Sequence, residues 1–172
     1  VGAVIEQEFV DVEDLMVVAN LPYYVTTPII MKLLEEKLPI RGIVCMLQKE
    51  VADRIAAKPG TKEYGSLSIA IQYYTVPETV MIVPKTVFIP QPNVDSAVIR
   101  IEPNGTPLLD EEDEKFFFRV IKSGFSQRRK TAANSISSGS GIPKDVVIKA
   151  IEECGFEPSV RAEGLTMQEL SQ

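Results

Sequence analysis

Apolar runs alternate with helical repeats at the start of the chain. Residues 16–19 and 42–47 are unbroken apolar runs, which is typical of parallel strands buried on both faces. Between them, residues 27–37 place apolar side chains three and four positions apart, which predicts a helix that Thr27 caps and Pro39 ends. Strand, helix and strand in this order predict an α/β fold with a parallel pair of strands.

The following segments predict helices and then an antiparallel pair of strands. Residues 49–58 have the pattern of a short helix, and a second helix is favoured over a strand for the segment that begins at Ser66. Residues 79–83 and 96–101 are predicted to be strands on either side of a proline-punctuated loop. We expect these two strands to close one edge of the sheet.

After a Pro-, Asn- and Gly-rich linker, the pattern becomes helical. One predicted helix begins with the acidic residues 110–114, another covers residues 143–154, and Thr166 with Glu169 forms a capping box for a last helix. The Ser- and Gly-rich residues 137–141 are interpreted as a flexible loop, which follows no strand and is not expected to bind phosphate. We therefore divide the chain into an α/β part, residues 1–105, and a small helical part, residues 106–172.

Composition narrows the possible chemistry. Apolar residues make up 45% and charged residues 24% of the chain, an ordinary globular balance, and no apolar run approaches the roughly 18 residues of a membrane span. Histidine is absent, which excludes Ser-His and Cys-His catalysis and histidine metal sites on this chain. Cys45 and Cys154 have no metal-like spacing, so we expect two structural thiols in a reduced, cytoplasmic protein with no metal and no membrane association.

The net charge of −6 hides a basic region. Residues 116–144 contain no acidic residue and six positive charges, with the densest cluster at Arg128, Arg129 and Lys130. Such a patch suits phosphate groups even on an acidic chain, although a solvated basic helix end would have the same composition.

The first predicted strand ends in a polar corner, Asn20, Leu21, Pro22 and Tyr23. In open α/β sheets, ligands bind outside the carboxyl ends of the strands. The Asn20 side-chain oxygen and a main-chain carbonyl of the Leu21–Pro22 turn could accept both hydrogens of an aromatic amine, and Tyr23 offers a stacking face. The corner therefore suits methyl transfer to a base amine, with catalysis chiefly by orientation.

These residues resemble a known family. The sequence "NLPYYVTTPII" is similar to the Asn-Leu-Pro-Tyr motif of the ribosomal RNA adenine dimethyltransferases, and "LQKEVADRI", "YGSLSI", "VFIPQPNVDSAVIRI", "FSQRRKT" and "RAEGLTMQEL" agree in order over nearly the whole chain. The resemblance implies the second half of a Rossmann-like methyltransferase domain that uses S-adenosylmethionine, followed by a small all-helical domain. It is strongest to the bacterial enzymes that dimethylate N6 of two adjacent adenosines near the 3′ end of 16S rRNA, during maturation of the small ribosomal subunit.

The resemblance also implies residue roles. Asn20, Leu21 and Pro22 would contact the methyl donor and the target amine. Tyr23 and Phe88 would stack on opposite faces of the flipped adenine. Phosphates of the rRNA would be bound by five basic side chains, namely Arg128, Arg129, Lys130, Lys49 and Arg54. The family's Gly-rich turn and ribose-binding acid have no counterpart here, so we expect a fragment that is inactive by itself and has an incomplete donor site. We also expect a monomer.

Three alternatives stay open. A non-catalytic RNA-binding factor in ribosome assembly would need the basic helical part and not the polar corner. A 23S rRNA adenine methyltransferase of the macrolide-resistance type typically has isoleucine where Leu21 stands. A DNA adenine methyltransferase would carry a target-recognition insert, and no such insert is visible.

Overall fold

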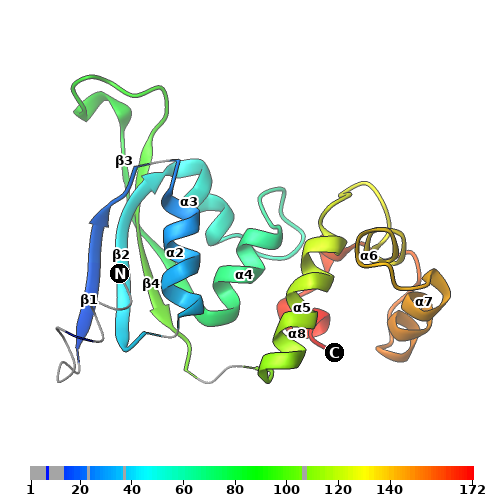
Figure 1. Ribbon diagram of the computed structural model, residues 1–172. Coiled ribbons are helices and arrows are strands. Elements are labelled where there is room, and N and C mark those ends of the chain that lie inside the picture. Colours follow the sequence, from blue (N-terminus) through cyan, green and yellow to red (C-terminus); the bar gives the residue numbers. More distant parts are fainter. Residues whose placement is uncertain (1–6, 8–13, 23, 37, 106–107) are drawn as a thin grey trace. The chain divides into compact units, whose positions relative to one another are not determined.

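The computed structural model describes residues 7, 14–22, 24–36, 38–105 and 108–172, so Tyr23 lies outside the described residues (Figure 1). The chain folds into two units, one of Val1–Ala56 with Ile71–Thr106 and one of Ala57–Ala70 with Pro107–Gln172. The linker predicted near residue 105 lies at one boundary between them. The segment Ala57–Ala70, which the sequence analysis placed in the α/β part, belongs to the helical unit.

The first unit is built on a four-stranded sheet with the order β1-β2-β4-β3. Its strands are β1 (Leu15–Asn20), β2 (Ile40–Gln48), β3 (Thr75–Val83) and β4 (Ser96–Pro103). β1 pairs in parallel with β2, while β4 pairs antiparallel with both β2 and β3. The predicted parallel pair and the predicted antiparallel pair at one edge are both confirmed. The expectation that β1 is buried on both faces was wrong, since Val18 is 77% exposed.

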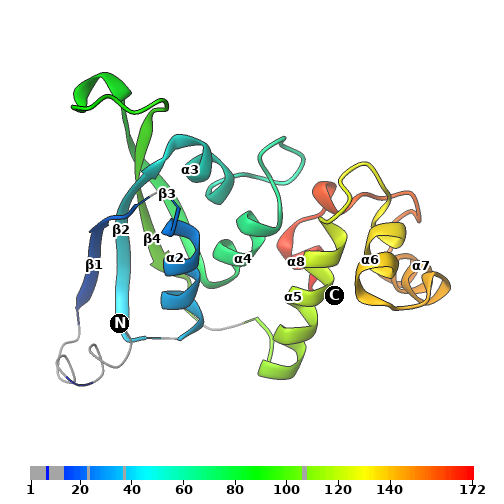
Figure 2. The same ribbon diagram turned by 45° about the horizontal axis from the view of Figure 1, so that its top comes forward.

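Helices of the first unit cover one face of this sheet (Figures 1 and 2). They are α2 (Thr26–Glu35), α3 (Lys49–Ile55) and α4 (Ser66–Tyr74), the last of which crosses the boundary between the units. The apolar side of α2 is buried at Ile30, Leu33 and Leu34, as its spacing predicts. The helix assigned to the ambiguous segment after Gly65 is likewise confirmed.

The start of α2 differs from the prediction. Val25 is the N-cap residue and Thr27 makes no capping hydrogen bond. Instead, the hydroxyl of Thr26 donates to the Pro22 carbonyl at 3.1 Å, and the Val25 N–H donates to the same oxygen at 3.1 Å. The turn is therefore closed by a backbone acceptor inside the Asn-Leu-Pro corner, a partner that propensity rules do not identify.

The second unit is helical. It contains α5 (Glu111–Gly124), α6 (Ala132–Ser140), α7 (Lys144–Glu153) and α8 (Met167–Leu170). Asp110 caps α5 by accepting from the N–H groups of Glu112 and Asp113, and the predicted capping box of Thr166 and Glu169 is present. A small apolar core of α6 and α7 residues holds this unit together, with Ala132, Ala133, Ile136 and Val147 buried in it.

Residues 137–141 are not a flexible loop, so that interpretation was wrong. Residues 137–140 are the last turn of α6, and Gly141 ends the helix in the left-handed conformation at φ 78°. A Cβ on Gly139 would lie 2.7 Å from the Ser123 Cβ, so the small residue permits close packing of α6 against α5. Tertiary packing overrides the loop-like composition here.

The described part of the chain was searched for clusters of metal-ligating side chains and for long apolar helices. No group of three or more Cys, Asp or Glu side chains among these residues could hold a metal ion. No helix in the same residues is long and apolar enough to cross a bilayer.

Candidate methyl-acceptor corner

The sheet topology brings two distant segments to one edge. β3 runs in the same direction as β1 and β2, because both β2 and β3 are antiparallel to β4. The carboxyl ends of these three strands therefore meet at the edge where β4 begins, and residues 84–95 connect β3 to β4 at that edge. The Asn-Leu-Pro corner follows β1 at the same edge, where open α/β sheets bind their ligands.

Hydrogen bonds fix the two ends of the loop formed by residues 84–95. The Lys85 N–H donates to the Asp95 carboxylate at 2.9 Å, and the Lys49 N–H donates to the Asp95 carbonyl at 3.0 Å. Residues 85–87 form a short 3₁₀ helix, η1 (Lys85–Val87), directly before Phe88. The bond from Lys85 to Asp95 thus joins the two ends of the loop that carries Phe88.

The corner and this loop line one open cavity of about 360 Å³. Its walls are Asn20, Leu21, Pro22, Met46, Phe88, Pro90 and Pro92. The volume falls in the range of roughly 300–1,000 Å³ that is usual for small-molecule sites. No titratable side chain is among these lining residues, so the described walls supply shape, an amide and an aromatic ring.

Asn20 faces this cavity from the exposed end of β1. Asn20 pairs with Met46 across the β1–β2 ladder, and both residues line the same cavity. Within the described residues no hydrogen bond engages the Asn20 side chain, and the residue is exposed. Its amide is therefore available to a ligand.

The main-chain acceptors of the turn are not equivalent. The Pro22 carbonyl already accepts from the Val25 N–H and the Thr26 hydroxyl, as described above, which uses both of its lone pairs. The sequence does not distinguish between the carbonyls of this turn. The structure leaves Leu21 as the better candidate.

The structure brings only some of the predicted residues together. Asn20, Leu21, Pro22 and Phe88 share the cavity, whereas nothing can be placed for Tyr23, which lies outside the described residues. Met46, Pro90 and Pro92 were not predicted to line it. The β1–β2 register could have identified Met46, because residues opposite one another on parallel neighbours share a face.

The basic residues on α3 pair within their own helix. Lys49 forms an ion pair with Asp53 at 2.6 Å, and Arg54 forms one with Glu50. Both pairs have i,i+4 spacing and are partly exposed, so they are weak and can exchange partners.

Of the three clustered cations, Arg128 is not free. Its guanidinium donates to the Lys62 carbonyl at 2.7 Å, to the Tyr64 carbonyl at 3.3 Å and to the Glu163 carboxylate at 3.2 Å. Arg128 therefore has partners within the protein, although its side chain is 47% exposed. Arg129 and Lys130 are exposed.

The chain is similar to ribosomal RNA methyltransferases. A family model described as ribosomal RNA adenine dimethylase matches residues 1–169. Proteins named ribosomal RNA small subunit methyltransferase A from Bacillus mycoides (strain KBAB4) and Bacillus cereus (strain B4264) are each 58% identical over 174 residues, which cover 99% of this chain and 60% of theirs. The chain thus spans about 60% of the length of these curated relatives.

Two solved structures share the fold. A dimethyladenosine transferase from Plasmodium falciparum matches with a TM-score of 0.77 at 24% identity, over 91% of this chain and 64% of that one. The 23S rRNA methyltransferase ErmE matches with a TM-score of 0.65 at 22% identity, over 92% of this chain and 63% of its own. At these identities the likeness shows the fold alone, and it confirms the Rossmann-like α/β class expected from the sequence.

Proposed function

The chain belongs to the ribosomal RNA adenine dimethylase family, and on that premise we propose that it forms the methyl-acceptor part of an enzyme that dimethylates N6 of two adjacent adenosines near the 3′ end of 16S rRNA. The observation that carries the proposal is the shared cavity: Asn20, Leu21 and Pro22 meet Phe88 from a separate segment. The proposal includes the immature small subunit as partner, a monomeric protein and a cytoplasmic location.

The proposed role of Asn20 is to orient the target amine. The lone pair of an aromatic exocyclic amine is delocalised into the ring, so the nitrogen attacks poorly. Acceptors on both N–H groups favour a pyramidal nitrogen with its lone pair directed outward. The Asn20 side-chain oxygen and the Leu21 carbonyl are the two acceptors we assign, since the Pro22 carbonyl is occupied.

Phe88 is assigned to hold the base. A nucleotide must leave its stack before its amine can be reached, at a cost of a few kcal/mol. Stacking on an aromatic side chain offsets this at about 1–3 kcal/mol per base. Phe88 is half-buried and borders the cavity, so one side of the ring is supported by protein and the other is available. Tyr23 is proposed for the opposite face of the base.

S-adenosylmethionine, when bound, supplies the methyl group on a sulfonium centre. The cavity fits the reacting end of this group, because its walls are apolar apart from the Asn20 amide and the main-chain carbonyls. Its described walls provide no side-chain base to take up the proton released from the amine, so the proton passes to solvent through the open mouth. Orientation of this kind can lower the activation free energy by about 7–11 kcal/mol.

The test is Asn20→Ala in the full-length enzyme, assayed on immature small ribosomal subunits. We expect methyl transfer to fall at least about a hundredfold, since misplacement of a reacting group by 1 Å costs that much. RNA affinity should stay within about twofold, because the amide does not contact phosphates. Asn93→Ala is the matched control, since Asn93 is an exposed asparagine of the loop formed by residues 84–95 and is not among the cavity walls. Wild-type turnover in Asn20→Ala would reject the assigned role.

A further inference from the structure

The loop between α3 and α4 is fastened to the helical unit by its main chain. The Gly60 N–H donates to the Glu163 carbonyl at 2.8 Å, with Gly60 at φ 81°. Within the loop, the N–H and the hydroxyl of Thr61 both donate to the Lys58 carbonyl. The positive φ favours glycine at the position where the backbone turns toward Glu163.

Arg128 fastens the same loop from the side. Its three hydrogen bonds, to two loop carbonyls and to the Glu163 carboxylate, use the planar fork of the guanidinium. A lysine has one nitrogen on a flexible stem and cannot bind both carbonyls and the carboxylate with the same geometry. Arg128 therefore connects residues 58–64 to residues 126–131.

Tyr64 anchors the end of the loop. The residue is 1% exposed, its hydroxyl donates to the Leu165 carbonyl at 3.1 Å, and its ring meets Phe125 edge-on with centroids 5.9 Å apart. Burial, together with the negative charge of Glu169, raises the pKa of Tyr64 to about 12, so the phenol stays a donor at neutral pH. The inner side of the loop is thus fixed by both polar and aromatic contacts.

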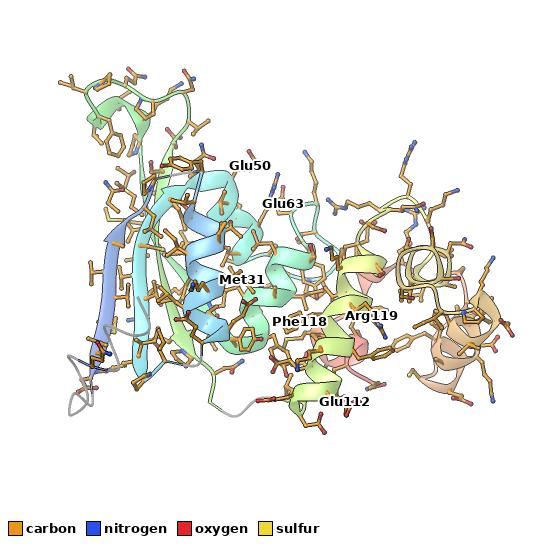
Figure 3. All side chains as sticks on the ribbon, in the orientation of Figure 1. Met31, Glu50, Glu63, Glu112, Phe118 and Arg119 are labelled. Atoms are coloured by element: carbon orange, nitrogen blue, oxygen red, sulfur yellow. The ribbon has the colours of Figure 1, made fainter. Side chains whose placement is uncertain are left out.

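Two loops, residues 58–64 and residues 126–131, carry four exposed cations, Lys58, Lys62, Arg129 and Lys130. We call these four residues the two-loop basic surface. Glu63 is an exposed acid on the same loop as two of them (Figure 3). The segment from residue 58 to 64 was not recognised in the sequence as basic, because its two lysines stand apart from the Arg-Arg-Lys cluster along the chain.

We propose that the two-loop basic surface binds the phosphate backbone of folded rRNA, and that Arg128 is a positioning residue that holds the Lys58–Lys62 loop beside Arg129 and Lys130. The proposal rests on the proposed function for the identity of its partner. It changes the role of Arg128 from a phosphate contact to an internal brace, and it adds two lysines to the binding surface.

The composition of the surface favours phosphates over a protein partner. None of the large hydrophobic residues found exposed in the described chain lies in residues 58–64 or 126–131. Protein interfaces have an apolar core, often with aromatic anchors, whereas phosphate contacts need exposed cations that release counterions. Two exposed lysines and an exposed Arg-Lys pair on loops that Arg128 connects meet the second requirement.

The first experiment measures affinity of the 172-residue chain for a transcript of the 3′ domain of small-subunit rRNA, without methyl donor, over a series of salt concentrations. Each phosphate contact contributes about 0.7–0.9 units to the log–log slope. Lys58→Gln with Lys62→Gln should lower the slope by about 1.5 units, and Arg129→Gln with Lys130→Gln by a similar amount. Lys149→Gln on α7 is the matched control, and Glu63→Gln should tighten binding. An unchanged slope in the Lys58/Lys62 variant would overturn the proposal that the two-loop basic surface binds phosphates.

The second experiment isolates the brace. Arg128→Lys keeps the charge but loses the fork, so we expect it to lower the slope by up to about 1.5 units in the wild-type background. It should have no further effect when Lys58 and Lys62 are already glutamine. If Arg128→Lys lowers the slope equally in both backgrounds, Arg128 contacts phosphate directly, and its role as a positioning residue is rejected.

Tyr64→Phe supplies the same test with no change of charge. It removes one buried hydrogen bond of the loop and retains the ring, so the fold should persist while RNA affinity falls. RNA affinity equal to wild type in a folded Tyr64→Phe protein would also count against positioning of the loop. Because these measurements need no methylation, they remain informative if Asn20 proves not to act on the amine. Binding of unrelated RNA with equal affinity and slope would retain the surface but reject its dedicated partner.

Discussion

The two faces of the sheet use alternate residues of the same strands for different purposes. On the face covered by α2, α3 and α4, the β2 residues Ile43, Cys45 and Leu47 are almost completely buried. On the opposite face, Asn20 and Met46 pair across the ladder and border the cavity, and Val18 is 77% exposed. The covered face provides the core, and the open face presents the candidate chemistry at its edge.

The comparison shows why an exposed asparagine can be held in place. Ala19 precedes Asn20 and pairs with Cys45, which in turn pairs with Ile99, so this row joins three strands through the covered face. Because side chains alternate across a strand, a well-packed row at one position fixes the direction of the next. Rigid elements position a functional group better than loops do.

The largest effect should come from the covered face. Ile99→Ala removes a side chain that is 1% exposed, and we expect a loss of about 2–5 kcal/mol in the free energy of unfolding. Val98→Ala, one position along and on the opposite face, should cost less, since Val98 is only partly buried. Urea denaturation of both variants measures the difference. Equal losses would mean that the two faces are packed alike.

Thiol chemistry sharpens the same comparison. Burial raises the pKa of the Cys45 thiol to about 11 from its ordinary 9.0, so its thiolate fraction near pH 8 should be about a hundredfold lower than that of an ordinary cysteine. A thiol reagent should modify the partly exposed Cys154 rapidly and Cys45 only slowly. The Cys154→Ser protein isolates the slow reaction.

The same raised pKa has a consequence for stability. The folded state disfavours the Cys45 thiolate, so the unfolded chain loses this proton at a lower pH than the folded chain does. The contribution of the neutral Cys45 thiol to the free energy of unfolding is therefore present in full below pH 9 and is lost as the pH rises through about 11. A shift of this size corresponds to about 2–3 kcal/mol. Between pH 8 and 11, the free energy of unfolding measured by denaturation should fall less in Cys45→Ala than in the unmodified protein. Rapid labelling of Cys45 at pH 8 would show that the covered face opens readily.

Much of the fold could be predicted because its signals are local. Unbroken apolar runs identified β1 and β2, and the Thr166–Glu169 spacing identified the start of α8. Residues 137–140 were misassigned because serine and glycine have weak helix propensity, and burial of Ile136 with the close approach of Gly139 to Ser123 decides the conformation instead. Such contacts join segments that no local pattern connects.

The site divides in the same way. Asn20, Leu21, Pro22 and Phe88 could be identified from short motifs, and the sheet topology explains why they share a cavity. The partners of Arg128 could not be identified, because two of them are backbone carbonyls that any residue provides. Sequence therefore indicates which side chains carry chemistry better than it indicates which cations are engaged inside the protein.

The smallest effect should come from the open face, and the test uses two identical substitutions. Val18→Thr replaces a methyl group with a hydroxyl on an exposed side chain and keeps the β-branched shape, so the free energy of unfolding should change by no more than about 0.5 kcal/mol. Val17→Thr makes the same change on the neighbouring residue, which points to the covered face and pairs with Ile43. There a hydroxyl without a partner should cost about 1–3 kcal/mol.

Chemical denaturation of these two valine variants compares the faces at a single strand. A loss in Val18→Thr as large as in Val17→Thr would contradict the exposure of Val18 and would mean that the open face packs against another part of the chain. The same pair in a protein with the full length of the curated relatives extends the comparison. If Val18→Thr is neutral in the 172-residue chain but costs more than about 1 kcal/mol there, the face is covered in the larger protein, and the cavity beside Asn20 is deeper than it is here.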